Sequence, residues 1–290
     1  MVHVLAAREY KLLIKSSEFQ ARPTLQTANE FWTSRIESVV ALIANDPEPF
    51  DEAVYRVIRF WDTSDCVLSR NDLILRTREE VDENFVSTGK SEITLKLRMP
   101  DQFVVASTSL AANGNGIETK FEEDIGPLEI AGSRPGEKTQ VIVPVKRSTR
   151  NRFSLSTTMK INSQQRLTRL GDLLEAFPGV KEIVPNQTLG ASLNSGPINY
   201  EYAFKKGKAE FPNNVDGKFT LSLWCFRSPS GDPDVAELSY TCKTQNGGVP
   251  GKAAREAYDL FILLQNRLGD IIDPENTSKT TLALPKGCGG

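Results

Sequence analysis

The stretch ITLKLRM occupies residues 93–99, and its apolar and polar side chains alternate without interruption. Successive side chains of a β-strand point to opposite faces of a sheet. This run therefore predicts a strand with one apolar face and one polar face. The polar face carries Thr94, Lys96 and Arg98.

The same alternation recurs elsewhere in the chain. LILRTR at residues 73–78 puts Arg76 and Arg78 on one face, and Arg150 and Arg152 share a face further on. One interpretation is a sheet with a buried face and a solvated face, which is common in antiparallel sheets. These polar faces are rich in arginine and lysine, however, whereas a solvated face usually mixes both signs of charge.

A second interpretation is that the sheet closes with these faces inward. Burying like charges without partners costs several kcal/mol per ion, so such a cavity would have to hold water, a polyanion or both. Arginine forks match phosphate oxygens, and lysine serves as a point charge. Glu9, Glu122 and Glu237 lie on strand-like segments and could hold a metal ion beside the polyanion.

About eight runs of strand composition alternate irregularly with three helical patterns, at residues 27–44, 167–177 and 252–268. Thr27 is the expected N-cap of the first helix. Because there is no strict alternation of strands and helices, we expect an α+β fold with an antiparallel sheet or barrel.

The composition excludes several classes of protein. The chain has 290 residues, of which 39% are hydrophobic, so it can bury a core and is not wholly disordered. Its formal net charge of −2 argues against a globally basic nucleic-acid-binding surface. No stretch approaches the ~20 apolar residues of a membrane-spanning helix, and the first residues do not have the pattern of a signal peptide.

Histidine and cysteine are scarce. His3 is the only histidine, so mechanisms that need two imidazoles are excluded and Ser-His-Asp chemistry is not expected. None of the four cysteines forms a C-x-x-C pair, so we expect reduced thiols in a cytoplasmic protein rather than a zinc or redox motif.

Three stretches resemble the CYTH family, also called triphosphate tunnel metalloenzymes. REYK at residues 8–11 is similar to the family's E-x-E-x-K signature. FWDTSD at residues 60–65, which leads into residues 73–78, resembles an aromatic-Asp-Thr-x-Asp turn followed by an L-x-L-R-x-R strand. TLKLR at residues 94–98 resembles the next strand of the family. The order and rough spacing agree across about residues 3–268.

The resemblance implies an eight-stranded antiparallel closed β-barrel, the triphosphate tunnel, with supporting helices. It would form one domain at residues 1–270, followed by a loosely ordered tail at residues 271–290. Known members hydrolyse inorganic, thiamine or RNA 5′-triphosphates, or cyclise ATP, with Mg²⁺ or Mn²⁺. The implied roles are catalysis by Glu9 and Lys11, metal binding by Glu9, Glu122 and Glu237, and phosphate binding by Arg76, Arg78, Lys96, Arg98, Arg150 and Arg152.

The chain departs from the family's pattern at two positions. Ala7 stands where the signature has its first glutamate, and Ser239 stands where some members keep a second acid. Mg²⁺ tolerates such losses, because one or two carboxylates plus substrate phosphates and water can hold it.

The sequence is therefore compatible with three functions. The first is metal-dependent hydrolysis of tripolyphosphate or of a small organic triphosphate. The second is binding of phosphate-rich ligands without turnover, and the third is a class IV-type adenylyl cyclase. A small triphosphate or polyphosphate is the expected partner; a membrane or nucleic acid is not expected, and the oligomeric state is left open.

Overall fold

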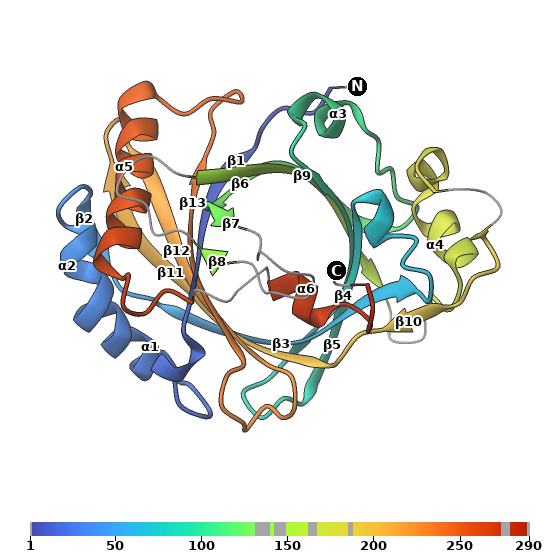
Figure 1. Cartoon of the computed structure of the whole chain (residues 1–290), viewed down its shortest axis with the longest axis horizontal. Helices are drawn as coiled ribbons and strands as arrows, with labels where there is room; N and C mark the ends of the chain where they lie inside the picture. Colours follow the sequence, from blue (N-terminus) through green and yellow to red (C-terminus); the bar gives the residue numbers. More distant parts are fainter. Residues whose placement is uncertain are drawn as a thin grey trace.

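Most of the chain is β-structure, and Figure 1 shows the long strands curling round a central space. The computed structural model describes residues 2–130, 140–141, 149–161, 167–184, 188–273 and 279–288. The strands of its large sheet are β1 (Ala7–Ile14), β2 (Asn45–Glu48), β3 (Glu52–Thr63), β4 (Leu73–Val81), β5 (Ser87–Met99), β6 (Asn115–Pro127), β9 (Thr149–Ile161), β10 (Leu193–Ser195), β11 (Asn199–Phe211), β12 (Val215–Cys225) and β13 (Val235–Lys243). Two short strands, β7 (Glu129–Ile130) and β8 (Gln140–Val141), pair separately.

The large sheet has 11 strands in the order β10-β3-β4-β5-β9-β6-β1-β13-β12-β11-β2. An additional pairing between β3 and β11 closes the run from β3 to β11 into a ring. The strand expected at residues 140–145 is seen only as β8, because residues 142–148 lie outside the described residues.

The helices are short apart from one. They are α1 (Leu25–Phe31), α2 (Glu37–Val40), α3 (Gln102–Ser107), α4 (Leu170–Ala176), α5 (Gly251–Arg267) and α6 (Lys279–Ala283). A π-helical segment, η2 (Trp32–Ile36), joins α1 to α2, and the 3₁₀ segments are η1 (Ser16–Glu18), η3 (Ser69–Asn71) and η4 (Pro178–Glu182).

The α+β class is confirmed, but the sheet differs in detail from the expected eight antiparallel strands. The ring contains nine strands, and β1 pairs antiparallel with β13 but parallel with β6. Alternation predicts where strands lie and not how they pair. A parallel pair needs a long crossover connection, which the chain between β1 and β6 provides.

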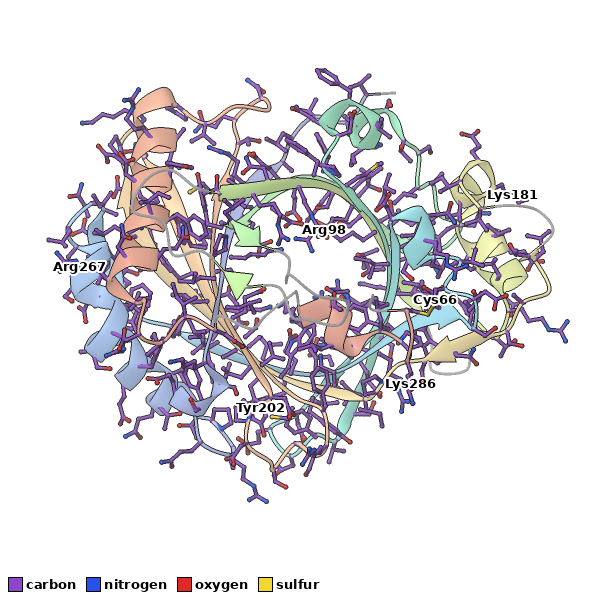
Figure 2. The ribbon with its side chains drawn as sticks, viewed as in Figure 1. Cys66, Arg98, Lys181, Tyr202, Arg267 and Lys286 are labelled. Atoms are coloured by element: carbon purple, nitrogen blue, oxygen red, sulfur yellow. A yellow bond between two sulfur atoms is a disulfide. The ribbon has the colours of Figure 1, made fainter. Side chains whose placement is uncertain are left out.

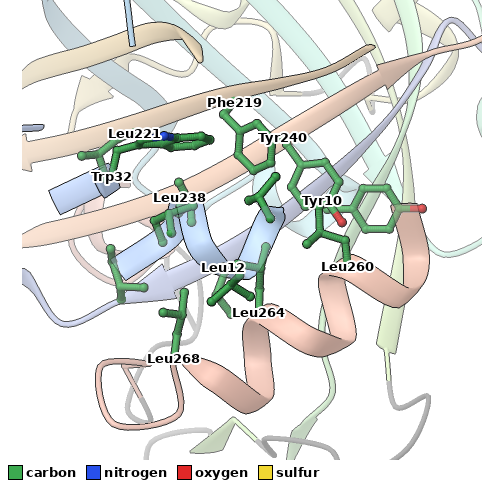
Figure 3. Packing of buried hydrophobic residues seen from close by; sticks show 14 of the residues in the cluster. Tyr10, Leu12, Trp32, Phe219, Leu221, Leu238, Tyr240, Leu260, Leu264 and Leu268 are labelled. Atoms are coloured by element: carbon green, nitrogen blue, oxygen red, sulfur yellow. The ribbon is translucent and has the colours of Figure 1, made fainter. Parts of the chain in front are cut away.

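The ring carries its apolar side chains mainly on the outside. On one side, the outer faces of β1, β11, β12 and β13 pack against α1, η2, α2 and α5. Figure 3 shows Tyr10 and Tyr240 in this cluster, and their ring centroids are 4.7 Å apart. Trp32 packs edge-on against Phe219, with a centroid separation of 5.0 Å.

A second outer cluster lies on the other side of the ring. Leu75, Leu95 and Leu155 from β4, β5 and β9 pack there with Leu173 and Phe177 near α4, and α3 contributes to the same cluster. These strand residues are the apolar partners of the basic faces identified in the sequence. The alternation therefore separates an apolar outer face from a polar inner face.

Of the helices expected from helical periodicity, one is confirmed and another is interrupted. The pattern at residues 252–268 is confirmed as α5. The pattern at residues 27–44 is not one helix, because the π-helical segment interrupts it. Its N-cap is Thr24 rather than Thr27, since the Thr24 side chain accepts a hydrogen bond from the Thr27 backbone N–H.

The expectation of reduced thiols is wrong for two of the four cysteines. Cys66 and Cys288 form a disulfide, with their Cα atoms 5.1 Å apart, whereas Cys225 and Cys242 are free and buried. A pairing across a sequence separation of 222 residues leaves no local signature in the sequence. In the region expected to be a loose tail, the described residues include α6 and one half of this disulfide.

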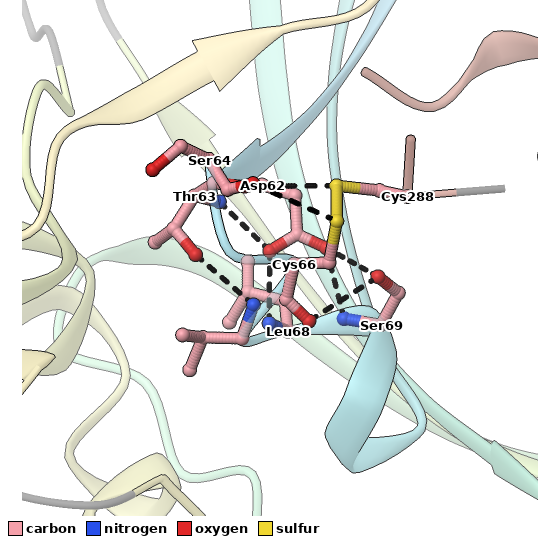
Figure 4. The surroundings of a disulfide bond; sticks show 8 residues. Asp62, Thr63, Ser64, Cys66, Leu68, Ser69 and Cys288 are labelled. Atoms are coloured by element: carbon pink, nitrogen blue, oxygen red, sulfur yellow. Dashed lines mark hydrogen bonds between the residues drawn. A yellow bond between two sulfur atoms is a disulfide. The ribbon is translucent and has the colours of Figure 1, made fainter. Parts of the chain in front are cut away.

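The loop that presents Cys66 is organised by Asp62, as Figure 4 shows. The buried Asp62 carboxylate accepts hydrogen bonds from the backbone N–H groups of Thr63, Leu68 and Ser69. Side-chain to backbone bonds of this kind stabilise turns.

Within the described ranges, no helix combines the length and apolar character needed to cross a bilayer.

The outer core gives a direct stability prediction. Phe219 is fully buried between Trp32 and Tyr240, so Phe219→Ala should lower the free energy of unfolding by about 3–5 kcal/mol in urea titrations. The matched control is Phe103→Ala, because Phe103 is 81% exposed. It should change stability by less than about 0.5 kcal/mol. Equal losses in the two variants would contradict this assignment of the core.

Candidate functional site

The inner face of the ring surrounds a cavity of about 380 Å³. Eleven basic and six acidic side chains are among the described residues that line it. The chain as a whole has a net charge of −2, so positive charge is concentrated inside the ring. Figure 2 shows Arg98 in this central region.

All of the residues predicted to form the site line this one cavity. They come from six neighbouring strands, so the alternation that defined them places them on a shared inner face. Their roles in phosphate and metal binding stay predictions. The residues are Glu9, Lys11, Arg76, Arg78, Lys96, Arg98, Glu122, Arg150, Arg152 and Glu237.

The cluster at the centre of this group is organised by Asp124 of β6. Its carboxylate lies 2.7 Å from Lys11 Nζ, 3.3 Å from Lys96 Nζ and 3.0 Å from Arg98 Nε. Burial alone would raise the pKa of Asp124, but the three cations outweigh burial and hold that pKa well below its usual range. Asp124 is thus an ionised carboxylate shared by cations from two strands, β1 and β5.

Glu9 and Glu122 lie beside this cluster. Burial would raise the pKa of Glu9, but the Lys11 ammonium, 2.9 Å away, lowers it overall. The pKa of Lys11 is raised in turn by Asp124 and Glu9, despite its burial. Glu122 behaves differently: burial first, and then the negative charge of Glu9, raise its pKa.

Three basic side chains of β4 and β5 are incompletely compensated. Burial and the neighbouring cations Lys11 and Arg98 lower the pKa of Lys96 to about 8, although Asp124 opposes the shift. Burial and the adjacent Arg78 lower the pKa of Arg76 to about 9. The Nε atoms of Arg76 and Arg78 are buried and lack a hydrogen-bond partner among the described residues. An anion in the cavity would supply acceptors for these donors.

A second charged cluster was not predicted from the sequence. The buried Glu201 of β11 lies 3.0 Å from Arg56 Nη1 of β3 and accepts a hydrogen bond from Trp224 Nε1 at the same distance. Lys205, two inward positions further along β11, also lines the cavity. Glu201 and Lys205 share a parity opposite to the apolar Tyr202 and Phe204, so the parity rule applied to this strand would have found them.

The predicted metal ligands do not gather into one group. No cluster of three or more His, Cys, Asp or Glu side chains suited to a metal ion is present in the part of the chain that the structure describes. Glu237 of β13 is the register partner of Leu13 of β1, which lies four residues beyond Glu9 on that strand. At about 3.3 Å per residue, this register separates the two backbone positions by roughly 13 Å.

Glu237 has a partner of its own, Lys279 of α6. The Lys279 Nζ atom lies 2.6 Å from Glu237 Oε1 and 4.8 Å from the centre of the Trp224 ring. Lys279 was not predicted to belong to the site, because nothing in the local sequence around it connects the C-terminal region to the ring.

Comparison with known proteins gives matches among solved structures only. No family model matches the chain, and no curated protein matches it. HpAC1 from Hippeastrum, described as an adenylyl cyclase-type protein with a dominant triphosphatase activity, shares 12% identity over 93% of this chain and 91% of its own, with a TM-score of 0.40.

Two further structures match at similar levels. A protein of Bacillus halodurans, described as an adenylate cyclase candidate, shares 10% identity over 94% of this chain and 95% of its own, with a TM-score of 0.39. The PH1819 protein of Pyrococcus horikoshii OT3 shares 10% identity over 93% of this chain and 95% of its own, with a TM-score of 0.32. These similarities are low, and the proposals below rest on the residues of this chain.

The charge cluster around Asp124 generates a stability prediction. Asp124→Asn removes the carboxylate that three cations share, so it should lower the free energy of unfolding by about 3–5 kcal/mol at pH 7. The pKa of Asp124 is depressed in the folded chain, so this contribution is present above the ordinary aspartate pKa and is lost as the pH falls toward the depressed value.

Urea titrations at pH 7 and at pH 3 would measure both effects. Glu118→Gln is the matched control, because Glu118 is largely exposed and pairs with the exposed Lys120. It should change stability by less than about 1 kcal/mol. An Asp124→Asn protein as stable as the native chain at pH 7 would show that the cations are not held by this carboxylate.

Proposed function

We propose that the chain is a member of the CYTH, or triphosphate tunnel, family and hydrolyses a triphosphate inside the ring with Mg²⁺ or Mn²⁺. The substrate would be inorganic tripolyphosphate or a small organic triphosphate. The observation that carries this proposal is the closed ring of strands whose cavity is lined by an excess of basic side chains, with the buried Nε donors of Arg76 and Arg78 lacking a hydrogen-bond partner among the described residues.

The basic side chains would bind the phosphate groups. Arg76 and Arg78 offer donors in a planar fork that suits two phosphate oxygens at once, and Lys96 and Arg98 add charge from the neighbouring strand. Arg150 and Arg152 of β9 lie on the next strand of the same wall. Phosphoryl transfer depends mainly on positioning and on neutralising charge, which such a cage can provide without histidine.

A divalent cation would fit best near Glu9 and Glu122. Both are oxygen donors of the type that Mg²⁺ and Mn²⁺ prefer, and they influence each other's ionisation, so their carboxylates face a common region. Since Mg²⁺ is often held by one or two carboxylates together with substrate phosphates, these two carboxylates are enough for such a site. When bound, the ion would neutralise phosphate charge and orient the substrate.

Glu9 and Lys11 are the proposed catalytic pair. Glu9 stays ionised because Lys11 lowers its pKa, so it can accept a hydrogen bond from an attacking water molecule. Lys11 is held between Glu9 and Asp124, which fixes the position of its ammonium group next to the bound phosphates.

Binding without turnover is the second candidate, and a specific observation favours it. Glu9, Asp124 and Glu237 each form an ion pair with a lysine, and Ala7 and Ser239 remove two further acids. A cage of this kind could hold a polyphosphate and lack the free carboxylates needed to activate water. No feature of the described cavity points specifically to adenine recognition, so the cyclase reading rests on the resemblance alone.

A phosphate-release assay separates the two candidates. With tripolyphosphate and Mg²⁺ or Mn²⁺, the native chain should release phosphate, and Glu9→Gln should lower kcat by about 100-fold or more. Glu175→Gln is the matched control, because Glu175 is exposed on α4, outside the cavity. Its rate should equal the native rate.

Calorimetric measurement of tripolyphosphate binding completes the comparison of the candidate functions. Tripolyphosphate binding in a calorimeter without phosphate release would establish the non-catalytic candidate, and the absence of both binding and release would overturn the proposed function. ATP yielding a cyclic nucleotide and pyrophosphate would indicate the cyclase instead.

The pKa of Lys96 predicts the pH dependence of binding. Lys96 is cationic below its pKa of about 8 and neutral above it, so affinity for tripolyphosphate should weaken as the pH rises from 7 to 9.5. A single titrating cation contributes a slope of at most about one log unit of Kd per pH unit.

Lys96→Arg is the matched control for the pH dependence, because the ordinary pKa of arginine lies about two units above that of lysine, so this variant should keep more of its charge over this range. Its Kd should rise less steeply, while the ionisation of tripolyphosphate itself affects both proteins equally. Calorimetric titrations at pH 7, 8 and 9.5 with EDTA would measure the difference. Parallel profiles for the two proteins would show that Lys96 does not titrate in contact with the anion.

A further inference from the structure

The C-terminal arm, defined as residues 279–288, contributes to the same cavity without being part of the sheet. It consists of α6 and the turn that ends at Cys288, and Figure 1 shows α6 within the outline of the ring. Lys279 and Thr280 line the cavity together with the strand residues. The arm therefore forms part of the wall around the proposed site.

The arm places one cation against one carboxylate of the cavity. The ammonium of Lys279 lies 2.6 Å from Glu237, and both side chains are largely buried. The same ammonium lies over the face of the Trp224 ring, 4.8 Å from its centroid. While the arm is docked, Glu237 is thus occupied by an internal cation.

The apolar contacts of the arm are few. Ala283 is fully buried against Phe60 and Trp224, Leu284 is partly buried there, and Pro285 is also buried. A Cβ atom on Gly196 would lie 2.0 Å from the Ala283 carbonyl oxygen, so the backbone of the arm can approach this closely only because residue 196 is glycine. The fit is close, but it buries little apolar surface.

Besides the polypeptide chain, the Cys66–Cys288 disulfide attaches the arm covalently to the rest of the structure (Figure 4). Cys66 sits in the loop that Asp62 organises, and it adopts a left-handed backbone conformation, with φ at 58°. The disulfide thus joins a hydrogen-bonded loop to the last described residue of the arm.

We propose that this arm is a redox-controlled latch on the cavity, closed in the disulfide form and released when a dithiol reduces Cys66–Cys288. In that step the disulfide gains two electrons and two protons from the dithiol, which becomes a disulfide itself, and two thiols remain on the chain. Release withdraws Lys279 and Thr280 from the cavity wall and uncovers Glu237. This proposal deepens the proposed function, since it names the regulation of that same site.

The balance of forces favours release after reduction. Ordering ten residues costs conformational entropy along the whole arm, whereas the arm gains mainly the burial of two small side chains, part of a leucine, one ion pair and one cation–π contact. The disulfide removes most of that cost, because it keeps the arm beside its docking site in every conformation. Without it, docking becomes a local equilibrium that lies toward the open form.

Hydrogen exchange tests the latch without relying on any activity. The full chain would be compared oxidised and after reduction by dithiothreitol, with thiol content checked by alkylation and mass spectrometry. Peptides covering residues 279–288 should exchange about tenfold faster or more once the disulfide is reduced. The Cys66→Ser/Cys288→Ser double variant should exchange at the fast rate from the start and should not respond to dithiothreitol.

Binding of tripolyphosphate supplies the second readout. Stopped-flow measurements should show an association rate constant about tenfold higher for the reduced chain and the double variant than for the oxidised chain. Lys279→Gln with the disulfide intact removes the charge of Lys279 but keeps the arm attached. Residues 279–288 of this variant should therefore keep slow hydrogen exchange.

The outcomes distinguish the latch from the proposed function. Unchanged exchange of the arm after verified reduction would overturn the latch, whatever the binding result. Faster exchange with equal association rates would show that the arm leaves but does not gate the cavity, which also overturns the proposal. If tripolyphosphate binds neither form, the proposed function fails, and faster exchange of the arm would still show that it is released by reduction.

Discussion

The concentration of positive charge inside the ring is the constraint on which the rest of the structure depends. Cations from adjacent strands face one another across a small cavity, and acids such as Asp124, Glu9, Glu201 and Glu237 form close ion pairs with some of them. Burying like charges is costly unless partners compensate them. The acids on the inner face therefore stabilise the cavity, and the remaining excess of basic side chains would attract an anion.

This constraint also explains where the hydrophobic core lies. Because the interior of the ring is mostly charged, it holds a small apolar cluster around Phe60 and Trp224, and most apolar burial occurs on the outer face. Two separate clusters meet this need, one beneath α1, α2 and α5 and the other beneath α3 and α4. The helices are thus required by the polar cavity, because without them the apolar faces of the strands would be exposed to water.

Much of the cavity was predictable because β-strands alternate strictly. Lys96 and Arg98 were placed opposite Leu95 and Leu97 by sequence alone, and the structure shows the two pairs on the inner and outer faces. The α+β class followed from the number and order of strand-like runs. The parallel pairing of β1 with β6 was not predictable, since local periodicity contains no information about strand neighbours.

The parts of the site that were missed depend on contacts between distant segments. Lys279 meets Glu237 only because the C-terminal arm folds back, and the disulfide that holds the arm joins Cys66 to Cys288. Neither pairing has a local pattern. Glu201 is a different case, because its alternation with Tyr200 and Tyr202 is visible in the sequence and marks it as an inner-face residue.

A crystal structure of the chain with tripolyphosphate and Mn²⁺ would test the central claim most directly, because the Mn²⁺ ion can be located by its anomalous scattering. The account predicts phosphate density inside the ring, in contact with Arg76, Arg78 and Lys96, and an Mn²⁺ peak near Glu9 and Glu122. Phosphate density confined to the outer surface, with the cavity unchanged, would contradict it.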